Sequence, residues 1–188
     1  MDTATFLEIM SVQRHDFLNH LQVISGLVQL NKVERVREYI SQVSVEAERL
    51  SKVGHLNVPE VAAVLLVGHF LAGRHQVDVV YDINTSLESC SVSGEILGEV
   101  VEEVFAQSLE CLVPPGVPDR TLKISLIETE KKYLLKIFSP GPPGREAERA
   151  RDGLSRIGAK LIPYEGKVGM VVSAAGGEIF IMVPKKDA

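Results

Sequence analysis

The sequence has little of what marks several protein classes. Its only two cysteines, Cys90 and Cys111, lie in apolar or Ser-rich surroundings, so we expect buried, reduced thiols and no zinc knuckle. No apolar run is long enough to span a bilayer, and the N-terminus lacks the pattern of a signal peptide. The sequence has fewer basic residues (20) than acidic ones (25), which gives a formal net charge of -5. We therefore expect a cytoplasmic chain with neither nucleic-acid nor membrane partners.

Two long amphipathic helices are predicted within the first 54 residues. Over residues 6–30, apolar side chains recur every three or four positions, at Met10, Phe17, Leu21, Ile24 and Val28. A second stretch, from residue 33 to near Gly54, repeats this spacing. A helical hairpin cannot cover both apolar stripes, so we expect a homodimer whose core is a four-helix bundle. Alternatively, both stripes pack on the C-terminal half of the same chain.

A second domain is predicted beyond the proline-bearing stretch 54–59, which gives domains at residues 1–55 and 59–188. We expect helices at 60–71, 93–112 and 146–160, and a Pro/Gly loop at 139–144. The expected strands cover 77–83, 122–128 and 133–138, and a hairpin pairs 168–174 with 178–183. The predicted fold class is therefore α+β, a helical hairpin followed by a two-layer α/β sandwich.

The polar face of the first predicted helix carries residues that are candidates for catalysis. At about 100° per residue, His15, Asn19 and Gln22 lie opposite the apolar stripe. A phosphoryl acceptor needs an exposed, neutral imidazole, and the adjacent Asp16 could accept or orient the ring proton. Arg14 could meet and help neutralise an incoming phosphoryl group, and Asn19 can hydrogen-bond without a repelling charge. The alternative is an ordinary surface histidine.

The residues around His15 form a specific string. Residues 14–26 read Arg-His-Asp-x-x-Asn-x-Leu-Gln-x-Ile-x-Gly, which closely resembles the phosphoacceptor box of the sporulation initiation phosphotransferase B family and of related two-component sensor kinases. This resemblance implies that His15 is the phosphorylated histidine, with Asp16 and Asn19 as its box neighbours. His20 replaces a lysine that is often found there. The C-terminal part, by the same resemblance, has the skeleton of a histidine-kinase ATP-binding domain.

The nucleotide-binding boxes of that domain are degenerate in this sequence. Glu99 and Glu103 stand where the resemblance expects asparagines, and Ser139 stands where it expects the aspartate that reads adenine. Prolines interrupt the glycines of 139–144 and remove backbone donors, and the later Gly-rich motif is reduced to residues 152–155. With Glu102, this stretch has three carboxylates, and their negative charge would repel a bound triphosphate. We therefore expect a phosphotransferase that does not use ATP, with no tightly bound cofactor or metal.

A histidine box without a working nucleotide site must receive its phosphoryl group from another protein. The resemblance implies transfer through His15 between the aspartates of two response-regulator receiver domains, as in sporulation initiation. The expected partner-binding surface includes Arg14, Asn19 and Gln22, and Mg²⁺ is expected from the response regulator. Two alternatives remain, a sensor histidine kinase with a divergent ATP site and a non-catalytic module that binds response regulators. A metal site built from the five histidines is disfavoured by their spacing.

Overall fold

The structure, a computed structural model, describes residues 3–114, 117–141 and 153–186. The chain divides into two compact units, Met1–Ser51 and Lys52–Ala188. Within the described residues, no helix is both long and apolar enough to cross a membrane.

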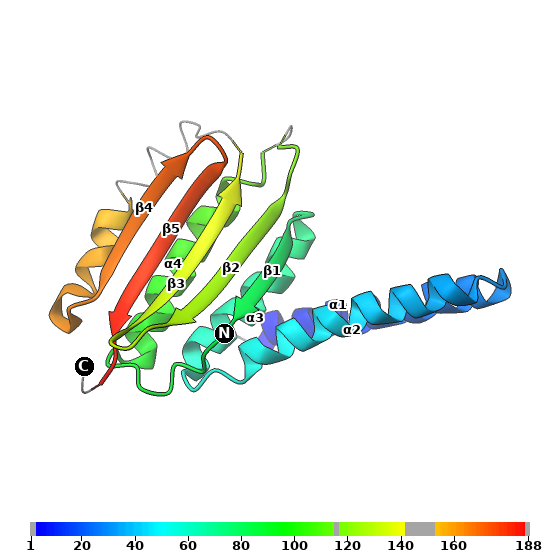
Figure 1. Ribbon diagram of the computed structural model, residues 1–188, viewed down its shortest axis with the longest axis horizontal. Coiled ribbons are helices and arrows are strands. Elements are labelled where there is room, and N and C mark those ends of the chain that lie inside the picture. The colour runs from blue at the N-terminus through cyan, green and yellow to red at the C-terminus, as the bar shows by residue number, and fades with distance from the viewer. Residues whose placement is uncertain (1–2, 115–116, 142–152, 187–188) are drawn as a thin grey trace. The chain divides into compact units, whose positions relative to one another are not determined.

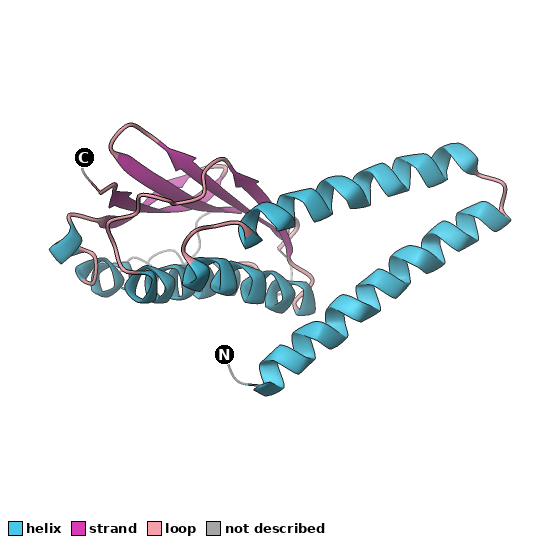
Figure 2. Cartoon of the chain, turned by 90° about the horizontal axis from the view of Figure 1, so that it is seen from below, coloured by secondary structure: helices cyan, strands magenta, loops and turns pink. Residues whose placement is uncertain are grey.

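The first unit is the predicted helical hairpin. Helix α1 covers Thr3–Gln29 and helix α2 covers Val33–Gly54, whose last turn already belongs to the second unit. The turn between them is short, and Figures 1 and 2 show the two long helices that it joins. Asn31 takes the left-handed conformation (φ 53°), which asparagine tolerates better than most residues. The N–H of Lys32 then reaches the carbonyl of Leu27 at 3.0 Å and closes the end of α1.

The hairpin leaves much of its apolar surface exposed. Four of the five predicted stripe residues of α1 are exposed, namely Met10, Phe17, Leu21 and Val28, while Ile24 is half-buried. On α2, Val33, Ile40 and Val45 are exposed as well. Two helices bury only the faces that they turn toward each other, so these side chains have no cover within the hairpin.

The second unit is a five-stranded sheet with helices on one face, as Figure 2 shows. Its strands are β1 (Asp78–Ile83), β2 (Thr121–Glu128), β3 (Lys132–Pro140), β4 (Lys167–Ser173) and β5 (Gly176–Pro184), in the order β1-β2-β3-β5-β4. Its helices are α3 (Pro59–Arg74), α4 (Gly94–Glu110) and a helical stretch over 153–159, followed by the 3-10 turn Ile162–Tyr164. The strands β1 and β2 are parallel, and the segment with α4 provides the crossover connection that parallel neighbours need. The other pairs are antiparallel. The predicted two-layer α/β sandwich is confirmed.

The core lies between the sheet and the helices. Alternate strand residues face the helices, as the buried side chains of Leu122, Ile124 and Leu126 show for β2. Helices α3 and α4 approach closely at Gly68, where a Cβ atom would come within 2.7 Å of the Phe105 ring. A residue with a side chain would not fit there without moving that ring.

Some predicted boundaries differ from the structure. The predicted loop 139–144 begins too early, because Ser139 and Pro140 continue β3 and pair with Gly177 and Gly176 of β5. The turn between β4 and β5 falls at residues 174–175, slightly before the predicted glycines. Of the predicted helix 146–160, residues 146–152 lie outside the described residues, as do 142–144 of the predicted loop.

The cysteine prediction is right for one residue and wrong for the other. Cys90 is buried, whereas Cys111 is only partly buried, and no disulfide joins the two. Cys111 follows the last residue of α4, where its Sγ lies 3.4 Å from the carbonyl of Gln107. A thiol in the final turn of a helix can satisfy a backbone carbonyl without entering the core.

Candidate functional site

The His15 side chain stands on the exposed side of α1. It lies well inside the helix, and its side chain is 72% exposed. Asp16 and Asn19 both contact the His15 ring at Nδ1. The carboxylate oxygen of Asp16 lies at 3.3 Å and the amide Nδ2 of Asn19 at 3.2 Å. The helix produces this cluster, because a residue four positions along returns to the same side one turn later.

The two contacts suit different proton positions on the ring. The Asp16 carboxylate accepts a hydrogen bond only when Nδ1 carries a proton, whereas an amide N–H donates to Nδ1 only when that atom is unprotonated. An amide turned by half a rotation presents its oxygen instead, so Asn19 can serve either state. Both contacts fall on Nδ1, which leaves Nε2 as the ring nitrogen for attack on an electrophile.

The structure brings together three of the five predicted site residues. His15, Asp16 and Asn19 form the cluster described above. Arg14 and Gln22 are exposed on the same helix, but neither hydrogen-bonds to the ring within the described part of the chain. Both remain available to contact a group that arrives from outside.

A second histidine contact joins the two helices of the hairpin. The Nδ1 atom of His20 lies 2.9 Å from the hydroxyl of Tyr39 on α2, and the ring centroids are 5.9 Å apart. Both side chains are half-buried. The sequence reasoning named His20 only as a replacement within the box and missed its partner. The signal that could have found the pair is the antiparallel arrangement of the helices, which brings polar residues far apart in sequence side by side.

In the second unit, the carboxylates of α4 at the degenerate box positions are held by a lysine. The ammonium of Lys160 donates to Glu99 at 2.9 Å and to Glu103 at 2.6 Å. These hydrogen bonds, that to Glu103 first, hold the pKa of Lys160 above its usual value. Ser139 lies in β3, where its hydroxyl donates to the backbone carbonyl of Ser108 at 3.5 Å, a long and weak contact.

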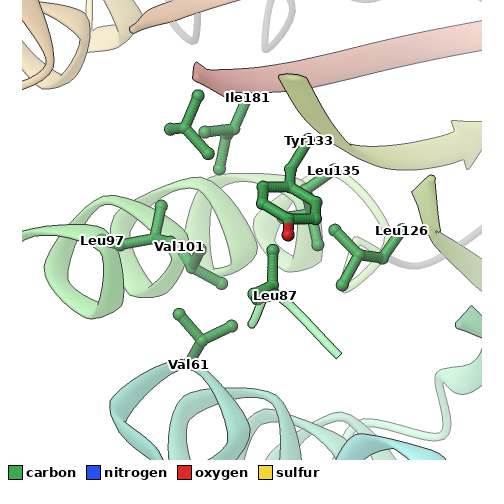
Figure 3. Close-up of a pocket in the computed structure, with 9 residues that line it drawn as sticks. Val61, Leu87, Leu97, Val101, Leu126, Tyr133, Leu135 and Ile181 are labelled. Atoms are coloured by element: carbon green, nitrogen blue, oxygen red, sulfur yellow. The ribbon is translucent and has the colours of Figure 1, made fainter. Parts of the chain in front are cut away.

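An apolar cavity lies inside the second unit, and Figure 3 shows its lining. Its volume is about 10 Å³, room for no more than one water molecule and far below the usual range for small-molecule sites. The lining is hydrocarbon apart from the hydroxyl of Tyr133, which accepts a hydrogen bond from the Ser89 N–H at 3.1 Å. A charged ligand would find no ionic partner in that lining.

Fold and site together combine a helical hairpin that carries an exposed histidine with a two-layer α/β sandwich. Residues 1–56 match the family model described as the alpha-helical domain of SpoOB-type sensor kinases. The hairpin is therefore a domain of this type, and the resemblance noted from the sequence is confirmed.

Two relatives come from Bacillus subtilis (strain 168). A probable C4-dicarboxylate sensor kinase is 30% identical over 144 residues, which are 72% of this chain and 26% of that protein. Sporulation initiation phosphotransferase B is 27% identical over 103 residues, 55% of this chain and 53% of that protein. The chain thus spans about a quarter of the first relative and about half of the second. It is a distant homologue of both kinds of protein.

The solved structures show the same fold. The catalytic domain of histidine kinase ThkA, in a nucleotide-free form, superposes with a TM-score of 0.54. The match covers 67% of this chain and 90% of that domain at 13% identity. At this identity the likeness establishes the fold and nothing about the ligand.

Proposed function

We propose that this chain is a phosphorelay phosphotransferase. Its His15 receives a phosphoryl group from the aspartyl phosphate of one response-regulator receiver domain and passes it to the aspartate of another. The observation that carries the proposal is the His15 ring, which lies within the matched domain and is 72% exposed, with Asp16 and Asn19 in contact with its Nδ1 atom. Sporulation initiation is the process in which we place this transfer, by homology with the relative named for it.

The transfer requires no redox change. The lone pair of His15 Nε2 attacks phosphorus, the bond from phosphorus to the aspartyl oxygen breaks, and the carboxylate leaves with that electron pair. The ring then carries a positive charge while its Nδ1 proton is directed at Asp16, 3.3 Å away. The second half of the reaction reverses these steps on another receiver domain. Positioning of the two proteins supplies most of the rate.

The docking surface that we propose is the exposed flank of α1 around His15. Arg14, Asn19 and Gln22 lie on this helix and are exposed to a partner. Arg14 can contribute a positive charge to the transferring group, and the amides of Asn19 and Gln22 can hydrogen-bond without repelling it. In this proposal the response regulator brings Mg²⁺ in its own acidic cluster, and this chain holds no cofactor tightly.

We also propose that two copies assemble through the apolar faces of the hairpin. The exposed stripe of α1 includes Phe17, Leu21 and Val28. A four-helix bundle built from two hairpins would cover these residues, and a two-fold dimer is the commonest closed assembly. On a helical wheel His15 lies about 140° from Met10, so the bundle would leave the ring accessible.

A sensor histidine kinase is the second candidate, favoured by the 30% identity to a probable C4-dicarboxylate sensor kinase. Such a kinase would phosphorylate His15 from ATP without any partner. Incubation of the purified chain with labelled ATP and Mg²⁺ separates the candidates. We expect no acid-labile label on the chain, and label on His15 would favour the kinase.

The proposed reaction is tested with purified components. A receiver domain carrying labelled aspartyl phosphate is mixed with the chain and with a second, unlabelled receiver domain. We expect acid-labile label on the wild-type chain and its passage to the second receiver domain. His15→Gln should abolish both steps, because the variant has no imidazole to attack phosphorus.

A matched control replaces another exposed histidine. His75→Gln changes the same residue type at the end of α3 and should transfer phosphate at the wild-type rate. Transfer that survives His15→Gln would contradict the proposal. Receiver-domain binding without any transfer by the wild-type chain would contradict it as well, and would favour a non-catalytic binding module.

A further inference from the structure

A polar cluster in the second unit takes no part in the chemistry proposed for His15. Lys160 lies at its centre and donates to Glu99 at 2.9 Å and to Glu103 at 2.6 Å. Arg156 adds a longer ion pair with Glu103, at 3.9 Å. The side chains of Lys160 and Glu103 are each about a third exposed, so water screens these contacts only in part.

The cluster follows one face of α4. Glu99, Glu103 and Gln107 are spaced by four residues, so they lie one above another on that helix. Segment 153–160 runs past them in the opposite direction. Its C-terminal end meets Glu99 and Glu103 through Lys160, and its N-terminal end abuts Gln107 at Gly153, where a Cβ atom would come within 2.5 Å of the amide nitrogen.

The other side of this segment is part of the core. Leu154, Ile157 and, just beyond the segment, Leu161 are buried. The segment is therefore amphipathic. Its apolar side chains lie in the core, and its cationic side chains contact carboxylates of α4. Burial fixes the segment in the fold, and its ion pairs face the carboxylates of α4.

This arrangement disagrees with the ligand that the fold implies. A histidine-kinase catalytic domain implies ATP and a magnesium ion at the box positions occupied here by Glu99 and Glu103. Both carboxylates are instead paired with one ammonium group of the same chain, and Arg156 supplies a second positive charge beside Glu103. A triphosphate placed at this face would meet two carboxylates of its own sign or would have to displace Lys160. The residues present do not fit the nucleotide.

We propose that Lys160 acts as an internal cation that keeps the face of α4 with Glu99 and Glu103 covered. Its ion pairs with Glu99 and Glu103 hold segment 153–160 on the surface where a nucleotide would otherwise lie. Segment 153–160 therefore covers this face of α4 when no ligand is bound. This inference concerns the second unit alone and does not depend on phosphotransfer by His15.

Amide hydrogen exchange of residues 153–160 in the full-length chain tests the proposal. In Lys160→Met, which keeps a long side chain but no charge, exchange of this segment should be faster by about two- to fivefold, the effect expected for partly exposed ion pairs. In the wild-type chain, millimolar Mg²⁺ and ADP should leave the exchange of the segment unchanged, because Lys160 already fills the face.

A charge swap and a matched control sharpen the test. Lys160→Glu places like charges together and should accelerate exchange further, and adding Glu103→Lys should slow it again by restoring an ion pair. Lys136→Met removes an ion pair with Glu178 on the sheet, 3.1 Å long, and should leave residues 153–160 unaffected. Unchanged exchange in both Lys160 variants, or protection of the wild-type segment by Mg²⁺ and ADP, would overturn the proposal. Neither result bears on transfer through His15.

Discussion

At the scale of single residues, the His15 cluster provides orientation more than binding energy. Asp16 is 55% exposed, and ion pairs between such exposed groups contribute about 0.2–1 kcal/mol. That is too little to drive phosphoryl transfer by itself. Asp16 and Asn19 instead hold the ring through Nδ1, and neither of them contacts Nε2. In the proposed transfer, further charge stabilisation would come from the receiver domain or from a neighbouring cation, and our candidate is Arg14, the residue before His15.

Arg14→Ala should therefore slow transfer into and out of His15. We expect a fall of about tenfold, or ~1.4 kcal/mol, since the transferring group loses one charge-assisted contact. Single-turnover transfer rates with a labelled receiver domain measure this. Arg37→Ala is the control, because Arg37 is an exposed arginine of α2 already paired with Glu34, and it should leave the rate unchanged. An unchanged rate in Arg14→Ala would show that Arg14 has no such role.

The contacts around His15 could be predicted from the sequence because they are local. His15, Asp16 and Asn19 lie within five consecutive residues of a helix, so helical geometry alone brings them together. The contact between His20 and Tyr39 could not be predicted in this way, because it depends on the relative rotation and register of two helices. The ion pairs of Lys160 are equally non-local, and they follow from packing within the second unit.

At the scale of secondary-structure elements, the hairpin depends on a few contacts across its two helices. The hydrogen bond between His20 and Tyr39 is one of them, at 2.9 Å between half-buried groups. Tyr39→Phe keeps the aromatic ring and removes the hydroxyl, so His20 Nδ1 loses a partner. We expect a loss of about 0.5–1.5 kcal/mol in the free energy of unfolding, measured by chemical denaturation followed by helical circular dichroism.

The control for Tyr39→Phe removes a different hydroxyl. Tyr164 is half-buried, and its hydroxyl makes no hydrogen bond to the described residues. Tyr164→Phe should therefore leave the free energy of unfolding within about 0.5 kcal/mol of the wild-type value. Equal losses in the two variants would show that the contact with His20 contributes nothing specific.

The order and type of the helices and strands were predictable from apolar runs and periods that proline, glycine and polar stretches separate. The end of β3 was not, since proline and glycine in 139–144 favour a loop. Pairing with β5 overrides that local preference. Gly176 takes a positive φ of 154° and lies so close to β3 that a Cβ atom would come within 2.2 Å of the Ser139 carbonyl oxygen. Glycine at this position lets β3 continue to Pro140.

At the scale of the whole molecule, the two units differ in how well they bury their apolar residues. The second unit has a closed core between sheet and helices, whereas the hairpin exposes an apolar stripe on each helix. Burying a large apolar side chain stabilises an assembly by about 1.5–3 kcal/mol, so several exposed ones together favour association. The sequence spacing predicts that such a stripe exists, but the pairing of its faces depends on three-dimensional complementarity.

Phe17 is the most sensitive position for testing this association, because it is a large aromatic residue and is 60% exposed in the hairpin. We expect the wild-type chain to sediment at roughly twice its mass of 20.6 kDa and Phe17→Glu to sediment as a monomer, since a carboxylate would be buried unpaired in the bundle core. Gln22→Glu introduces the same charge on the opposite side of α1 and should remain a dimer. A monomeric wild-type chain, or a dimer that tolerates Phe17→Glu, would exclude a four-helix bundle built on this stripe.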